Sequence, residues 1–130
     1  MTLAAILGVA IGAAIGAPLR FATDRFFIAR RGLKIPYGTF TVNLVGSLIL
    51  GLTTGLTAAL ASKGHDVPVF VTALIGTGGC GALTTFSGFS AQVLELSREP
   101  HGWHGPVYAT LSMVLGVGLA AGGFALGNLG

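Results

Sequence analysis

The chain has 130 residues, of which 52% are hydrophobic and only 8% are charged, and its mean hydropathy is +0.84. A water-soluble domain carries roughly a quarter charged residues, so this composition excludes a soluble protein and predicts an integral membrane protein. The net charge of +3 comes from the first loop, and a membrane surface explains it better than a nucleic-acid partner does. The single cysteine, Cys80, excludes an intramolecular disulfide and a multi-cysteine metal site.

Four long apolar segments predict four transmembrane helices within a single domain that covers residues 1–130. We expect the helices at about residues 3–27, 37–61, 67–96 and 106–129. Each is long enough to cross a hydrocarbon layer about 30 Å thick. Continuous apolar runs of this length favour helices over the short alternating strands of a barrel. The predicted fold class is therefore an all-α membrane protein.

Glycines recur at intervals of four residues in three of the four segments. In a membrane, small residues at this spacing let helix backbones approach closely, because lipid supplies no hydrophobic drive for association. We therefore predict tight helix packing and an oligomer. The glycines concerned are Gly8, Gly12 and Gly16 in the first segment, Gly51 and Gly55 in the second, and Gly118 and Gly122 in the fourth.

Polar side chains follow one face of the second segment. Thr39, Asn43 and Ser47 are spaced four residues apart, which stacks them along a helix. The amide of Asn43 needs partners in hydrocarbon. One interpretation is an interhelical hydrogen bond that holds a dimer together, and the other is a donor that lines a water-filled or ion-conducting path. The residue types alone do not decide between them.

Glycines and hydroxyl residues also interrupt the third segment. The glycines weaken a helix by roughly 1 kcal/mol each, so they predict a break near its middle, where the hydroxyls of Thr84 and Thr85 can satisfy freed carbonyls. After the break, Phe86 and Phe89 share one face, which indicates either packing or, in the company of Ser87 and Ser90, a functional path. The glycines are Gly76, Gly78, Gly79 and Gly81.

The fourth segment places Tyr108 and Ser112 one helical turn apart. Tyr108 is either an anchor at the membrane–water interface, which is usual for a tyrosine near the end of a segment, or part of a ladder of hydroxyls with Ser112. No acidic residue lies within the core of any segment, which disfavours a proton-coupled exporter of cations. The sequence also lacks a nucleophile–base pair, a P-loop and a dinucleotide fingerprint. We therefore predict that the protein is not an enzyme.

Three stretches are distinctive in combination: GAAIGAPLRF (Gly12 to Phe21), GTFTVNLVGSLILG (Gly38 to Gly51) and GCGALTTFSGFS (Gly79 to Ser90). In the same order they resemble the GxxxGAxxR[YF], GTxxVNxxGS and GxxGGxTTFSTF stretches of the Fluc/CrcB family of fluoride channels. The Tyr108–Ser112 pair falls where the fourth helix of that family has the same two residues. The resemblance covers essentially the whole chain.

The resemblance implies a fluoride-selective channel in the bacterial inner membrane, which exports fluoride passively and lowers its cytoplasmic toxicity. The channel would be a homodimer of antiparallel subunits in the lipid bilayer, with two pores that each draw on both chains. A structural sodium ion at the dimer centre would bind backbone carbonyls of Gly81 and Thr84.

The resemblance also implies the residues of the fluoride pathway. Asn43 would donate its amide to the ion, and Phe86 and Phe89 would face the path. Hydroxyls would continue the path, with Tyr108 near a pore end, and the charge of Arg20 would favour anions in a vestibule. The hydroxyl residues are Thr39, Ser87 and Ser112.

The chain departs from the family pattern at two positions and in its loop charges. Ala82 replaces a usual glycine, which bears on the cation site, and Gly88 replaces a usual threonine, which removes one hydroxyl from the path. Beyond Arg20, the first and third loops carry five Lys and Arg residues against one in the second loop, which predicts a preferred orientation rather than dual topology. The alternatives to a channel are a small multidrug-type exporter and a non-transporting assembly subunit.

Overall fold

The computed structural model describes residues 2–31, 37–98, 100 and 102–129, except for the side chains of Ile28, Arg30, Arg31, Tyr37 and Ser87. The prediction of four apolar helices long enough to cross a membrane is confirmed. The first, second and fourth are α1 (Leu3–Arg31), α2 (Tyr37–Ser62) and α6 (His104–Asn128). The third comprises α3 (Val69–Thr72), the π-helix η1 (Ala73–Cys80), α4 (Gly81–Leu83) and α5 (Phe86–Arg98).

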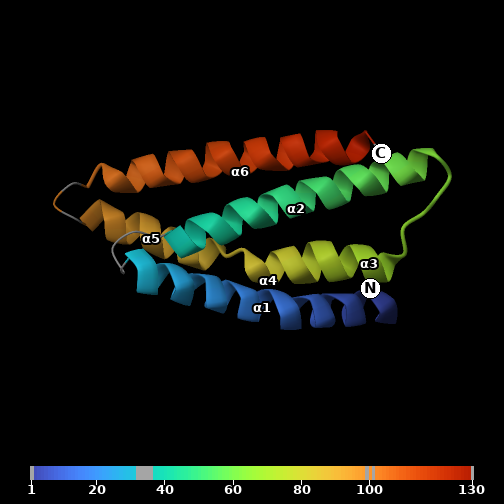
Figure 1. The fold of residues 1–130 in the computed structure, drawn as a ribbon, viewed down its shortest axis with the longest axis horizontal. Helices are drawn as coiled ribbons and strands as arrows, with labels where there is room; N and C mark the ends of the chain where they lie inside the picture. The colour runs from blue at the N-terminus through green and yellow to red at the C-terminus, as the bar shows by residue number, and fades with distance from the viewer. Residues whose placement is uncertain (1, 32–36, 99, 101, 130) are drawn as a thin grey trace.

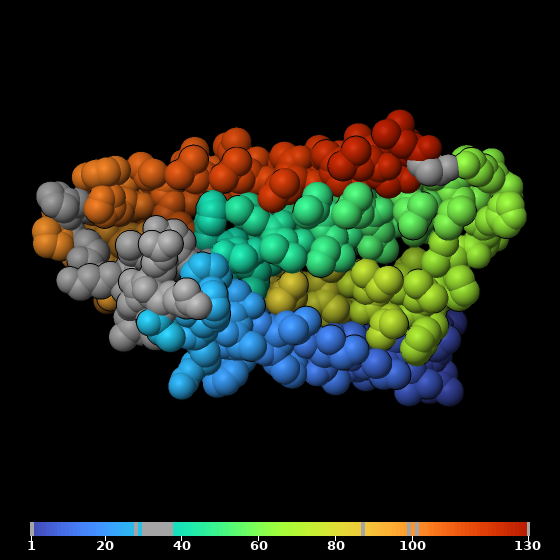
Figure 2. All heavy atoms as spheres, viewed as in Figure 1, coloured from blue at the N-terminus to red at the C-terminus, as the bar shows by residue number. Residues whose placement is uncertain are grey.

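The four spans run side by side, and both ends of the described chain lie at one end of the bundle (Figure 1). Seen from the same side, α1, the first half of the third span, α2 and α6 follow one another from one edge of the molecule to the other (Figure 2). Helix α2 packs along α6, and α1 packs along η1. Polar groups in the middle of this arrangement are therefore held between helices that are distant in the sequence.

The third span changes partners at its break. Its first half, through α4, packs against α1, whereas α5 packs against α6. The backbone becomes extended at Thr84, with φ −80° and ψ 160°, and the helix resumes at Phe86. The break lets one span begin beside α1 and end beside α6.

The position of the break corrects the expectation that the glycines interrupt the helix. Gly76, Gly78 and Gly79 all lie inside η1, and Gly81 continues into α4 with helical dihedrals. Their role is close packing instead: a Cβ on Gly78 would lie 2.9 Å from the Cα of Val9. A π-helix is wider than an α-helix, and glycine lets this wider turn approach α1.

Close packing at the predicted glycine spacing is confirmed for α1 and α2. A Cβ on Gly12 would lie 2.7 Å from the backbone N of Gly79, and one on Gly55 would lie 2.8 Å from the carbonyl C of Phe124. In the fourth span the predicted pair does not meet another described helix of the same chain. Cβ atoms on Gly118 and Gly122 would meet no described atom within 4 Å, whereas one on Gly123 would lie 2.7 Å from the carbonyl O of Leu48.

The reason for this difference is helical phase. Gly123 and Gly127 have the same spacing as Gly118 and Gly122 but lie on the face of α6 that turns toward α2. A spacing of four residues marks a face of a helix without stating which neighbour that face meets.

Candidate functional site

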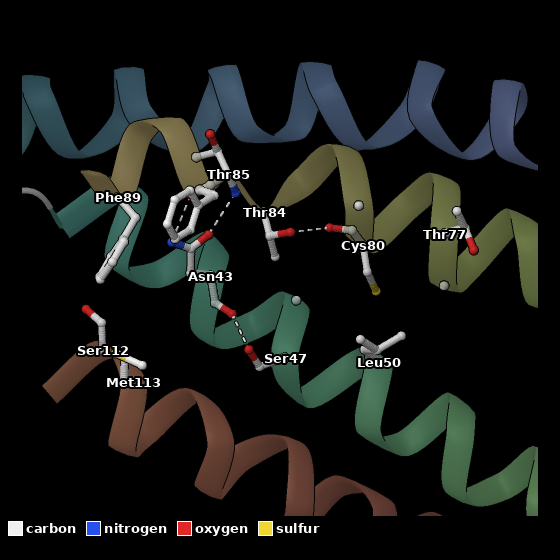
Figure 3. A pocket seen from close by; sticks show the side chains of 14 residues that line it. Asn43, Ser47, Leu50, Thr77, Cys80, Thr84, Thr85, Phe89, Ser112 and Met113 are labelled. Atoms are coloured by element: carbon white, nitrogen blue, oxygen red, sulfur yellow. Dashed lines mark hydrogen bonds between the residues drawn. The ribbon is translucent and has the colours of Figure 1, made fainter. Parts of the chain in front are cut away.

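A groove of about 690 Å³ lies where the break meets α2 and α6 (Figure 3). Five helical elements (α2, η1, α4, α5 and α6) and the extended segment contribute to it. None of its described lining residues carries a charge. The lining residues are Asn43, Gly46, Ser47, Leu50, Gly76, Thr77, Cys80, Gly81, Thr84, Thr85, Phe86, Phe89, Ser112 and Met113.

The amide of Asn43 joins α2 to the extended backbone at the break. Its Oδ1 accepts a hydrogen bond from the backbone N–H of Thr85 at 2.9 Å, and its Nδ2 donates to the Thr85 carbonyl at 3.4 Å. Figure 3 shows the side chain turned toward this segment. An NH₂ group has two hydrogens, so a second donor of Asn43 is left for another acceptor. Within one chain the structure therefore shows a bond from α2 to the break of the third span, and the dimer contact and the ion path both stay predictions for Asn43.

Both threonines of the break bond to backbone groups, and the predicted bond from a hydroxyl to a carbonyl is confirmed for Thr84. The Thr84 hydroxyl donates to the carbonyl of Cys80 at 2.8 Å, beside the backbone N–H of Thr84 at 2.9 Å. The hydroxyl oxygen of Thr85 accepts from the backbone N–H of Gly88 at 3.1 Å, which makes Thr85 the N-cap of α5. Side chains thus form hydrogen bonds with backbone groups on both sides of the break.

These hydrogen bonds withdraw two N–H groups from the helical ladder. In a continuous helix the N–H of Thr85 would pair with the carbonyl of Gly81, and the N–H of Gly88 would pair with the carbonyl of Thr84. Instead they donate to Asn43 and to the Thr85 hydroxyl. The carbonyls of Gly81 and Thr84 thereby lose their helical donors, and both residues line the groove.

Backbone carbonyls freed in this way are ligands for a hard cation such as sodium. In the described part of the chain, no group of three or more His, Cys, Asp and Glu residues has the arrangement of a metal site. The residues predicted to bind sodium through carbonyls therefore fit that ion by their chemistry.

Aromatic rings form a row at one end of the groove. The ring centroids of Phe86 and Phe89 are 5.9 Å apart, and Phe89 stacks on Tyr108 at 5.7 Å. Phe40 contacts the other end of the row, 6.1 Å from Tyr108. Phe86 is 79% exposed, although it follows the break directly. The row therefore runs from an exposed ring at the groove to a buried one behind it.

Two hydroxyls beside this row have no partner. Tyr108 and Ser112 lie one turn apart on α6, and the hydroxyl oxygens of both are buried without a hydrogen bond to any described residue. Leaving a buried hydroxyl unpaired costs about 1–3 kcal/mol, so this pair suits a site where an acceptor occupies the groove. Ser112 lines the groove and lies across it from Phe89 (Figure 3).

The structure brings most of the predicted site residues together but not all of them. Thr39 is buried, with 6% exposed, and neither it nor Tyr108 is among the residues that line the groove. Arg20 is partly exposed on α1, an element that does not contribute to the groove. Ser87 belongs to α5, but its side chain lies outside the described part of the structure.

The two departures from the family pattern fall on different sides of the break. The Cβ of Ala82 faces α1, where it lies 3.2 Å from the place of a Cβ on Gly16, and Ala82 does not line the groove. A Cβ on Gly88 would lie 2.7 Å from Cγ2 of Thr85. The methyl group of Ala82 therefore packs against α1, whereas Gly88 leaves room for the side chain of Thr85, which caps α5.

Sequence reasoning missed some lining residues. Thr77 was hidden among the glycines of the third segment, and Met113 and Leu50 look like ordinary apolar residues of a span. A signal for Thr77 was present, because it lies seven residues before Thr84, which is two helical turns and places both on one face.

The comparisons with known proteins agree on one family. Residues 7–124 match the family model described as "CrcB-like protein, Camphor Resistance (CrcB)". The chain is 42% identical over 112 residues to "Fluoride-specific ion channel FluC 1" of Streptomyces avermitilis, with 86% of each chain covered. It is 43% identical over 115 residues to the FluC 1 protein of Frankia casuarinae, covering 88% of this chain and 89% of the relative. It is 42% identical over 114 residues to "Fluoride-specific ion channel FluC" of Shewanella baltica, covering 88% of this chain and 85% of the relative.

Proposed function

Because this chain belongs to the CrcB-like protein family, we propose that it is a fluoride-selective ion channel. Its curated relatives carry the name of fluoride-specific ion channels over nearly the full length of the chain, and this observation carries the assignment. The protein is therefore a multi-pass membrane protein of the bacterial membrane and not an enzyme. It lets fluoride leave the cell passively and so limits fluoride toxicity in the cytoplasm.

The chemistry of the groove supports fluoride as the permeant ion. Fluoride is small and strongly hydrated, so a pore must replace its water with hydrogen-bond donors. The second amide hydrogen of Asn43 and the hydroxyl of Ser112 are neutral donors at the groove. Neutral donors bind an anion strongly enough for entry and weakly enough for exit, as conduction requires.

The aromatic row supports the same path. The edge of a phenylalanine ring carries the positive part of its quadrupole and can face an anion. Phe86 and Phe89 line the groove, and Tyr108 lies directly behind Phe89 with a buried, unpaired hydroxyl. We place Thr39 and Ser87 on the same hydroxyl track, and Arg20 at a vestibule where its charge attracts anions.

We further propose that two antiparallel copies form the channel. The groove contains polar groups at membrane depth, and irregular backbone survives there only when protein or a water-filled cavity covers it. A second copy would cover the groove of the first and contribute to two pores. The five-to-one charge bias of the loops favours one orientation, so dual topology requires the folded dimer to outweigh this bias.

A structural sodium ion at the dimer centre belongs to this proposal. The carbonyls of Gly81 and Thr84 would hold it, and two copies would supply four oxygen ligands. The ion would offset the partial negative charge of the freed carbonyls and join the two broken spans.

The test is fluoride efflux from liposomes that contain the purified protein, read with a fluoride electrode and repeated with chloride. We expect rapid fluoride release with chloride retained, and loss of release in Phe86→Ile and Asn43→Ala. A dimer that folds but releases no fluoride contradicts the proposal. If the variants dissociate in gel filtration while the wild type conducts nothing, the chain is an assembly subunit.

A multidrug-type exporter is not favoured by the site. Such an exporter needs a carboxylate in the membrane to exchange protons for a cationic substrate. Among the described residues that line the groove, none is acidic. The lining donors are neutral and suit an anion.

A further inference from the structure

The side chains of Thr85 and Asn43 meet on one short stretch of backbone, directly after the Thr84 carbonyl, which is one of the two carbonyls proposed to bind sodium. Asn43 reaches it from α2, and Thr85 belongs to the stretch itself (Figure 3). The proposed sodium ligands are backbone carbonyls, so neither of these side chains would coordinate the ion itself. Any effect that they have on a cation must therefore pass through the backbone.

The continuous helix and the broken helix compete for the same N–H groups. If the N–H of Thr85 returned to the carbonyl of Gly81, and that of Gly88 to the carbonyl of Thr84, helix would run through the break. The oxygen of Asn43 and the hydroxyl of Thr85 hold these N–H groups at 2.9 Å and 3.1 Å. Threonine is a favoured N-cap for this reason, since its hydroxyl ends the helix on the N-terminal side.

The same stretch connects the two proposed ion sites. The Asn43 amide bonds to both the N–H and the carbonyl of Thr85, and its remaining hydrogen is available at the groove. Phe86 follows Thr85 directly. A shift of the Thr85 backbone would therefore move one wall of the fluoride path and one side of the cation site together.

We infer that Thr85 is a positioning residue for the cation site: its hydroxyl, with the amide of Asn43, keeps the break open so that the carbonyls of Gly81 and Thr84 stay available to sodium. This inference rests on the sodium site of the proposed function. It assigns to Thr85 a role through the backbone, without contact with either ion.

Thr85→Val tests the inference, because valine keeps the shape of threonine but has no hydroxyl acceptor. The measurement is the melting temperature of the purified protein as sodium chloride replaces potassium chloride at constant ionic strength. An ion that binds only the folded state raises the melting temperature with its concentration. For the wild type we expect sodium to raise it and potassium not to.

In Thr85→Val the sodium concentration that gives a fixed rise in melting temperature should increase on the order of tenfold, the scale of losing one N-cap. A cap with a purely structural role would lower the melting temperature in both salts equally and leave the rise due to sodium unchanged. Thr85→Ser keeps the hydroxyl and should restore the wild-type response. Thr57→Val is the matched control, because the Thr57 hydroxyl bonds to the carbonyl of Thr53 within α2, away from the groove.

An unchanged response to sodium in Thr85→Val overturns the inference, and so does an equal loss in Thr85→Ser, which would assign the effect to the methyl group. If Thr85→Val does not fold, Thr85→Ala takes its place, since alanine also removes the hydroxyl that accepts from the N–H of Gly88. A wild type that conducts fluoride but does not respond to sodium overturns the inference and leaves the channel. A wild type that conducts nothing, with a sodium response lost in Thr85→Val, overturns the channel and leaves the inference.

Discussion

Asn43 illustrates how one side chain in a membrane serves structure and function at once. Its amide pairs with both backbone groups of Thr85, and it gives the Thr85 N–H an acceptor in place of the helical carbonyl of Gly81. Only one hydrogen is left for an ion. The oxygen and one hydrogen of the amide therefore support the backbone, and the other hydrogen is the one that could bind an ion.

Substitution of Asn43 should separate the two roles. Asn43→Ala leaves the N–H of Thr85 unpaired, which costs about 1–3 kcal/mol, so both stability and fluoride efflux should fall. Asn43→Asp keeps an acceptor for that N–H but brings a negative charge, so efflux should fall further than stability. Thermal melts and liposome efflux measure the two effects. Thr54→Ala is the control, since the Thr54 hydroxyl is exposed and bonds within its own helix. An Asn43→Asp variant that conducts like the wild type would contradict this account.

Phe86 and Phe89 differ in what they contribute to the single chain. Phe89 stacks between Phe86 and Tyr108, whereas Phe86 remains 79% exposed. Phe86→Ile should therefore change the free energy of unfolding by less than about 0.5 kcal/mol. Fluoride efflux should be lost, a fall of about tenfold or more, because the ring edge that faces the anion is lost.

The matched control for Phe86 is Phe124→Ile, at an exposed position of α6 that does not line the groove. It should leave efflux unchanged. If both variants reduce efflux equally, the effect of Phe86 is not specific to the path. Chemical denaturation and electrode recordings on the same preparations give the comparison.

The third span combines two structural features, a glycine-rich π-helix and a break flanked by threonines. Its glycines let a π-helix lie against α1, and its threonines end that helix and start α5 beside α6. The two features are adjacent in sequence but serve different neighbours. A change on the α1 side should therefore act on packing without rearranging the hydrogen bonds of the break.

Gly12→Ala tests the packing on that side. Its Cβ would collide with the carbonyl of Leu74 and would lie 2.7 Å from the N of Gly79, both of which are backbone atoms that cannot turn aside. We expect a loss of about 1–3 kcal/mol of stability. A Cβ at Gly118 would meet no described atom within 4 Å. Gly118→Ala should therefore raise stability by up to about 1 kcal/mol, because alanine has the higher helix propensity. Equal effects of the two alanines on the melting temperature would refute this reading of the contacts.

The groove poses the main problem at the scale of the whole molecule. It holds amide, hydroxyl and freed carbonyl groups on a chain whose four spans are apolar. A lipid tail cannot satisfy such groups, so a second copy is the covering that we propose. Dimer formation should then be sensitive to the size of residues at the groove and insensitive to the size of exposed residues on α1.

Thr77→Trp should reduce the dimer fraction about tenfold or more, because Thr77 is exposed in the groove and a bulky side chain there would hold two copies apart. Ile15→Trp places the same bulky side chain at a 56% exposed position of α1 and should leave the dimer intact. Gel filtration in detergent, with molar mass from light scattering, reads both. A dimer that survives Thr77→Trp and dissociates in Ile15→Trp would place the interface on α1.

Much of this protein is predictable from the sequence because hydrophobicity and length are local properties. The membrane class, the four spans, the break near the middle of the third and the threonines that support it all follow from composition and spacing. The groove collects Asn43, Phe86, Phe89 and Ser112, which are also visible as polar or aromatic residues out of place in a span.

Only the tertiary structure decided which partner each of these groups meets. The bond from Asn43 to Thr85 joins residues 42 positions apart, and no local pattern contains such a pairing. The same holds for the glycines: Gly123 packs against α2 while Gly118 does not, because the facing of a helix depends on its neighbour. The break falls at Thr84 and not at the glycines, since the N–H groups that end the helix find acceptors there and backbone contacts with α1 hold the glycines in helical form.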